Sequence, residues 1–129
     1  MPADIDRQFG RYNLPDHGNL LENMIRWALK GNVPVTVQGT GLVDCHLYSQ
    51  ANRMILHVVN LTSAGTWRAP VHELIPIGPF RIRVKLADGV SGKKLSMLVT
   101  NDKVSPAVSK GFCEFQIRSV LDHEVVVIS

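Results

Sequence analysis

The sequence predicts a mainly β protein: an antiparallel β-sandwich of about seven or eight short strands, preceded by one amphipathic α-helix. Three observations lead to this fold class. Beyond residue 31, apolar residues recur with a period of two in short segments, which is typical of half-buried strands. Turn residues, mainly glycine, asparagine and aspartate, separate these segments at the spacing of hairpins. Only residues 16–30 carry a sustained helical period.

The predicted helix, residues 16–30, has one apolar face. The residues that line this face recur three and four positions apart: Leu20, Leu21, Met24, Ile25 and Ala28. We expect Asp16 to cap the first turn and Gly31 to supply the left-handed residue after the last turn. Residues 1–15 contain two prolines and a glycine without a sustained period, so extended chain and turns are expected there.

The first strands follow from residues 33–61. Residues 33–38 alternate valines with other residues, and residues 42–49 are expected to point Val43, Cys45 and Leu47 inward. Residues 53–61, RMILHVVNL, carry apolar side chains at both odd and even positions, so both faces of a strand there would be apolar. This pattern suits a central strand that is covered on both faces.

The remaining strands follow a long connection, residues 62–79, which holds three prolines and is expected to be irregular. Residues 80–86, FRIRVKL, alternate most regularly of all, with Ile82 and Val84 inward. Three cations then face outward: Arg81, Arg83 and Lys85. Further strands are expected within residues 94–100, 111–120 and 123–129.

Cys45 and Cys113 are the only cysteines. Both lie on the apolar face of a predicted strand, so we expect buried free thiols. Such thiols do not decide the redox compartment, and the sequence does not indicate a localisation. An apolar run of membrane-spanning length and a signal-peptide pattern are both missing from the sequence, so neither a membrane span nor an export signal is expected.

The sequence offers little support for catalysis or metal binding. Its five histidines lack zinc-ligand spacings, and there is no G-x-S-x-G nucleophile motif. Asp4 and Asp6 alternate in the expected extended stretch, but nothing marks either as buried, so we expect solvated acids rather than a pair for glycoside chemistry. No catalytic residue, cofactor or metal ligand is therefore predicted.

Two surfaces have the residue types for ligand binding. Trp67, with Tyr48 and His46 on an outward face, could form a sugar platform; the simpler interpretation is that Trp67 packs the long connection onto the sandwich. Arg81, Arg83 and Lys85, with Lys93 and Lys94 near in sequence, could meet phosphate, although a solvated strand face has the same pattern. The net charge of +3 is spread along the chain and aromatics make up 6%, so a nucleic-acid footprint is not expected.

Asn60-Leu61-Thr62 matches a glycosylation sequon. The match has a consequence only if the chain passes through a eukaryotic secretory route.

PADIDRQF at residues 2–9, followed by PDHGNLLENMIRWAL at residues 15–29, resembles the end of the trimerisation domain of family 42 β-galactosidases and related glycoside hydrolases. In that amidotransferase-like α/β domain, the second piece is the last helix. VPVTVQGTGLVDCHLYSQANRMILHVVNLT is similar to the start of the all-β C-terminal domain that follows. Residues 72–86 and 121–129, HELIPIGPFRIRVKL and LDHEVVVIS, are similar to its middle and last strands.

The resemblance implies that residues 1–31 are the remnant of a preceding α/β domain and that residues 32–129 are a C-terminal β-sandwich domain. It further implies a non-catalytic accessory role, in packing, stability or assembly, within a glycoside hydrolase. The catalytic (β/α) barrel of such enzymes does not fit in 129 residues, so no family catalytic residue is carried over. The expected partners are the other domains of the parent enzyme.

Two alternatives from other classes stay open. One is a carbohydrate-binding module that uses Trp67, Tyr48 and His46; the other is a small basic phosphate or nucleic-acid binder. The apolar face of helix 16–30 would be exposed without the sheet that such a helix covers. We therefore expect it either to dock on the sandwich of its own chain or to form a homo-oligomer by pairing with the same helix of a second copy.

Overall fold

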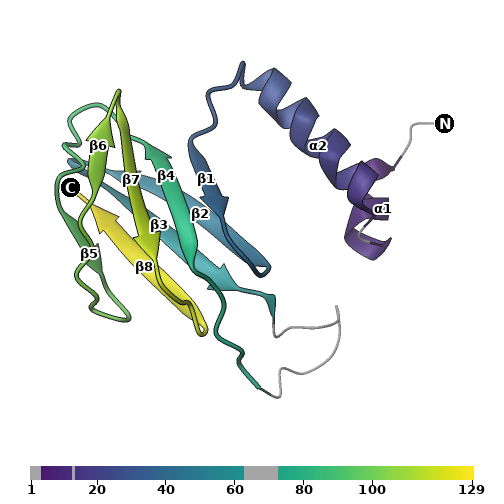
Figure 1. The fold of residues 1–129 in the computed structure, drawn as a ribbon. Helices are drawn as coiled ribbons and strands as arrows, with labels where there is room; N and C mark the ends of the chain where they lie inside the picture. The colour runs from purple at the N-terminus through teal and green to yellow at the C-terminus, as the bar shows by residue number, and fades with distance from the viewer. Residues whose placement is uncertain (1–3, 13, 63–72) are drawn as a thin grey trace. The chain divides into compact units, whose positions relative to one another are not determined.

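The structure is a computed structural model that describes residues 4–12, 14–62 and 73–129. The chain divides into two compact units, Met1–Pro34 and Val35–Ser129, of which the first is helical and the second is a β-sandwich (Figure 1). No helix among the described residues is both long enough and apolar enough to cross a membrane.

The helical unit contains α1 (Ile5–Tyr12) and α2 (Pro15–Ala28). The expectation of extended chain before residue 16 is wrong, because α1 occupies most of that stretch. A helix this short is marginal by itself in water and depends on packing. Ile5 and Phe9, one turn apart, are the half-buried residues of α1. The ring of Phe9 lies so close to Gly18 of α2 that a Cβ there would come within 2.8 Å of it.

Helix α2 begins differently from the prediction and ends earlier than predicted, at Ala28 instead of Lys30, although Gly31 is left-handed as predicted. Its N-cap is Leu14, without a side-chain cap, and Pro15 occupies the first turn, so the assignment of Asp16 as the cap is wrong. Asp16 lies inside the first turn, where a negative charge still interacts favourably with the helix dipole. At the other end, Gly31 has a φ of 76° and its amide donates to the carbonyl of Arg26 at 3.0 Å.

The sandwich consists of two four-stranded antiparallel sheets, which confirms the predicted fold class (Figure 1). The first sheet, in spatial order, is β1 (Val35–Gln38), β4 (Phe80–Lys85), β7 (Phe112–Ile117) and β6 (Ala107–Ser109). The second sheet is β2 (Val43–Gln50), β3 (Arg53–Asn60), β8 (His123–Ile128) and β5 (Leu95–Met97). The predicted central strand within residues 53–61 is β3, which lies between β2 and β8.

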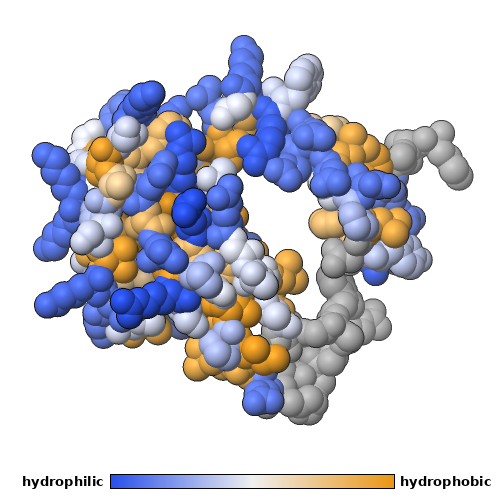
Figure 2. All heavy atoms as spheres, viewed as in Figure 1, coloured by the Kyte–Doolittle hydropathy of each residue, from blue (hydrophilic) through white to orange (hydrophobic). Residues whose placement is uncertain are grey.

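The core lies between the two sheets and is apolar. Its fully buried apolar side chains come from four strands and a bridge residue: Leu56, Val58, Phe80, Ile82, Val84, Cys113, Ile117, Val120, Val126 and Ile128. The β4 register is as predicted, with Ile82 and Val84 at 0% exposure and the intervening cations exposed. Figure 2 shows hydrophilic side chains projecting from the sandwich, with apolar side chains between them.

Both cysteines are free thiols, as predicted; Cys113 is buried and Cys45 is half-buried. Burial raises the pKa of both thiols, and the carboxylates of Asp44 and Glu114 add to the effect. A thiol with a raised pKa is a poor nucleophile at neutral pH. Cys113 belongs to the hydrophobic core, and Cys45 packs against it.

Candidate functional site

Three ring side chains gather on the outer face of the second sheet. His46 of β2 lies directly opposite His57 of β3, and Tyr48 is two residues further along β2. The His46 and Tyr48 rings are stacked, with centroids 6.5 Å apart and an interplanar angle of 19°. Tyr48 meets His57 edge-on, with centroids 5.7 Å apart. We call His46, Tyr48 and His57 the ring row.

The ring row contains two of the predicted platform residues and one that sequence reasoning missed. Trp67, the third predicted member, lies outside the described residues. His57 could have been found from the turn at Ala51 and Asn52, because a hairpin closed there pairs residue 46 with residue 57. The missing signal was cross-strand register rather than residue type.

The ring row presents aromatic and polar groups to solvent. Tyr48 is 55% exposed, so part of its ring is accessible to a ligand. Nε2 of His46 lies 2.9 Å from a carboxylate oxygen of Asp44, which places an imidazole and an acid beside the rings. Half-buried aliphatic side chains of the same face surround them: Ile55, Val59, Val125 and Val127.

The cations of β4 are exposed but do not form an unbroken basic stripe. Nε of Arg83 lies 3.1 Å from Oε1 of Glu114, and the guanidinium lies over the ring of Phe112 at 3.5 Å from its centroid. Arg81 is in register with Gln38 and Gln116. The central cation of β4, Arg83, is thus neutralised by a neighbouring acid. This pairing favours a solvated strand face over a phosphate-binding site.

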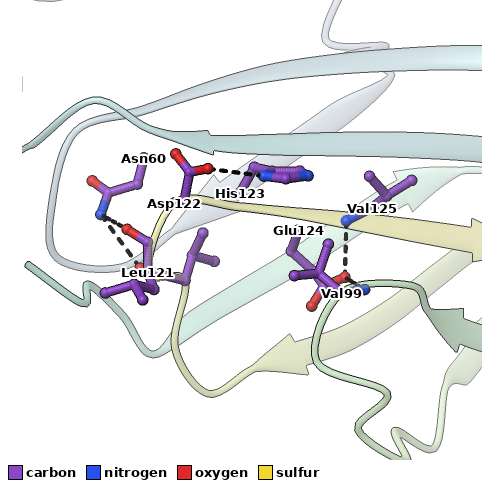
Figure 3. Close-up of polar contacts among 8 residues, drawn as sticks. Asn60, Val99, Leu121, Asp122, His123, Glu124 and Val125 are labelled. Carbon is purple, nitrogen blue, oxygen red and sulfur yellow. Dashed lines mark hydrogen bonds and ion pairs between the residues drawn. The ribbon is translucent and has the colours of Figure 1, made fainter. Parts of the chain in front are cut away.

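The sequon asparagine is a structural residue. Asn60 is 7% exposed, and its side-chain amide donates to the carbonyl of Ile75 at 2.8 Å. It also donates to the carbonyl of Leu121 at 2.7 Å (Figure 3). Its side-chain oxygen accepts from the amide of Thr62 at 2.9 Å. In the folded chain the atom that would carry a glycan is therefore buried and bonded, so the sequon match does not mark a modification site.

Glu124 of β8 is a fully buried carboxylate, at 0% exposure (Figure 3). Oε1 accepts from the amides of Val99 at 3.0 Å and Val125 at 2.9 Å. Oε2 accepts from the amide of Thr100 at 3.0 Å and from its hydroxyl at 2.8 Å. Burial would raise the pKa of Glu124, but these hydrogen bonds outweigh it and hold the pKa below its ordinary value.

Glu124 is therefore a clamp on the segment that follows β5 and not a catalytic acid. A general acid for glycoside chemistry needs a raised pKa and an accessible proton, whereas this carboxylate is ionised and fully occupied. Asp4 and Asp6 are exposed at the start of α1, where Asp4 pairs with Arg7 at 3.6 Å. Within residues 4–12, 14–62 and 73–129, no group of three or more His, Cys, Asp or Glu side chains is placed to hold a metal ion.

The apolar face of α2 is largely exposed. Leu20, Met24 and Ile25 are 44%, 55% and 57% exposed, Ala28 is also exposed, and Leu21 is half-buried. The residues predicted for packing or self-association thus have the exposure that such a role needs. What covers them stays a prediction.

The chain matches no family model, and no curated protein matches its sequence. Among solved structures it is similar to alpha-L-fucosidase isoenzyme 2 from Paenibacillus thiaminolyticus, with a TM-score of 0.77 and 15% sequence identity. The match covers 97% of this chain and 19% of that chain, so this chain spans about a fifth of the fucosidase. At this identity the similarity establishes the fold: the chain has the fold of a segment of a glycoside hydrolase, without pointing to family 42 in particular.

Proposed function

We propose that this chain is a non-catalytic accessory region of a glycoside hydrolase. Residues 32–129 are its C-terminal β-sandwich domain, and residues 1–31 are the end of the α/β domain that precedes it. The observation that carries the proposal is the similarity to a fucosidase segment over 97% of the chain, helical unit and sandwich together. The resemblance of residues 2–9 and 15–29 to the family 42 trimerisation domain supports the same assignment.

The side chains of the sandwich support a role in packing. The buried carboxylate Glu124 is occupied by backbone and hydroxyl donors, and the buried amide of Asn60 joins three separate backbone segments. The exposed apolar face of α2 is of the kind that a helix presents to a sheet or to another helix. In the parent enzyme this face packs within the preceding domain.

Two measurements test the proposal. The purified chain should hydrolyse none of the nitrophenyl glycosides, α-L-fucoside and β-D-galactoside included, because it has neither a paired-carboxylate cleft among its described residues nor the length for a barrel. The coding sequence upstream of Met1 should encode a (β/α) barrel in the same frame. Turnover that follows the chain through purification, or an upstream stop codon with no barrel, contradicts the proposal.

A second candidate function, carbohydrate binding, is favoured by the ring row. Stacked and edge-on rings beside an acid suit the C–H face and hydroxyls of a pyranose. Glycan-array binding should be lost on Tyr48→Ala or Trp67→Ala. Tyr12→Ala is the matched control, because Tyr12 is an equally exposed tyrosine, at 63%, on α1. Binding that survives Tyr48→Ala, or is lost equally on Tyr12→Ala, rules out the ring row as the site.

A further inference from the structure

A cavity of about 370 Å³ lies where the segment after β5 faces the end of β7. Its apolar lining comes from Met97, Val104 and Ile117, and its polar lining includes Asp102, Lys103 and Arg118. This volume is within the range of roughly 300–1,000 Å³ that small-molecule sites occupy. The cavity lies apart from the ring row, which is on the outer face of β2 and β3 and contributes no residue to it.

One wall of the cavity is held in place by the Glu124 clamp. Its carboxylate accepts from the amide of Val99 (Figure 3). It also accepts from the amide of Thr100, two residues before the lining segment Asp102 to Ser105. Asn101 follows with a φ of 57° and turns the chain into the lining segment. A wall fixed by a buried ionic acceptor is preorganised, so a ligand does not have to order it on binding.

The charged side chains around the cavity have no ionic partner among the described residues. In the part of the chain that the structure describes, none of the ion pairs involves Asp102, Lys103 or Arg118. Two cations against one acid leave a net positive charge at the rim. The planar guanidinium of Arg118 can donate two parallel hydrogen bonds to a carboxylate or sulfate, and the lining residues Ser105 and Gln116 supply groups for hydroxyls.

We propose that this cavity binds the acidic group of an anionic saccharide, with Arg118 and Lys103 as the anion-binding residues. The shared chemistry is an oxyanion on a hydroxylated ring, either the carboxylate of a uronic acid or a sulfate ester. The two cations of the cavity indicate that the ligand is an anion. That the ligand is a saccharide is inferred from the proposed role in a glycoside hydrolase, and this part of the proposal rests on that role. Ser105 and Gln116 hydrogen-bond the ring hydroxyls next to the charged group.

The test is a titration of the full chain followed by amide chemical shifts. A digalacturonate and a sulfated galactose disaccharide are the two anionic probes, and neutral galactobiose is their control. At millimolar concentrations the anionic probe that fits should shift the amides of residues 102–105 and 116–118, and galactobiose should not. The anionic probe with the larger shifts identifies the acidic group.

Variants then assign the contact. Arg118→Ala and Lys103→Ala should each weaken binding roughly tenfold, because each removes a charge-assisted hydrogen bond. Arg53→Ala is the charge-matched control, since Arg53 lies at the start of β3 and lines no part of this cavity. All three positions are exposed, so thermal melts should confirm intact folding.

The proposal is overturned if neither anionic probe shifts these amides, if galactobiose shifts them equally, or if binding survives Arg118→Ala. None of these outcomes affects the turnover assay or the upstream reading frame. The cavity assignment and the accessory function can therefore fail independently.

Discussion

Replacing Glu124 by glutamine should destabilise the sandwich strongly at neutral pH. The substitution keeps the shape of the side chain but removes its charge and turns one of its two acceptor oxygens into a donor. Oε1 can still accept from Val99 and Val125 in the glutamine, whereas the amide of Thr100 then faces an NH₂ group. This part-buried backbone donor loses its acceptor, and the remaining hydrogen bonds lose their ionic partner.

The expected loss is about 3 kcal/mol. Hydrogen bonds to a charged group contribute roughly 1.5–3 kcal/mol each, and a buried unpaired donor costs about 1–3 kcal/mol. For a sandwich of this size, 1 kcal/mol corresponds to roughly 4–8 °C in melting temperature. A decrease of roughly 12–24 °C is therefore expected for Glu124→Gln, measured by circular dichroism and by urea unfolding at pH 7.

The difference between wild type and Glu124→Gln should shrink in acid. Because the folded-state pKa of Glu124 is lowered, its carboxylate contributes stability that is complete above the unfolded pKa, about 4.3 for glutamate. This contribution is lost as the pH falls through the lower, folded-state pKa. Urea unfolding at a series of pH values from 7 downward should show wild type converging on the variant below about pH 4.

Glu114→Gln is the matched control. Glu114 is an exposed acid on β7 that pairs with Arg83 on the surface. Its loss should therefore change the free energy of unfolding by less than about 1 kcal/mol. If Glu124→Gln is as stable as Glu114→Gln at pH 7, or if the gap to wild type persists unchanged in acid, the clamp does not stabilise the fold as described.

Three further predictions follow from the same structure. Val84→Asp should abolish cooperative urea unfolding, because it places an unpaired charge at a position with 0% exposure. Arg81→Glu, on the opposite face of β4, should change the free energy of unfolding by less than about 1 kcal/mol. If the two substitutions destabilise the protein equally, the β4 register is wrong. Asn60→Asp should lower the free energy of unfolding by about 2 kcal/mol, because it removes the donor to the carbonyls of Ile75 and Leu121. If the variant melts thermally at the same temperature as the wild type, Asn60 does not have this role. Ile25→Asp should abolish concentration-dependent self-association of the full chain in sedimentation velocity; a chain that is monomeric at every concentration would contradict pairing through α2.

The strand register was predictable because its signal is local. In residues 80–86 every second side chain is apolar, and the period of two in a strand assigns those side chains to one face whatever the rest of the fold. The alternation in β2 was predicted in the same way, although Val43, Cys45 and Leu47 are half-buried and the expected full burial of Cys45 is wrong. The helical period of α2 and the left-handed Gly31 after it are local signals of the same kind.

Helix α1 was missed because its stability is not local. Eight residues with a glycine at position 10 have little helical tendency by themselves. The contact that favours the helix joins Phe9 to Gly18 in α2, and a sequence window over residues 5–12 does not contain that partner.

The functional residues divide in the same way. The sequence by itself determined that Tyr48 and His46 share an outward face. It did not decide which way Glu124 points, because residues 125–128 are apolar on both faces of the strand. Only the tertiary structure decided what each meets: His57 arrives from β3 by cross-strand pairing, and the amides that hold Glu124 ionised arrive from the segment after β5. Parity is a property of neighbours along the chain, whereas a hydrogen-bond partner more than twenty residues away exists only once the sheets have closed.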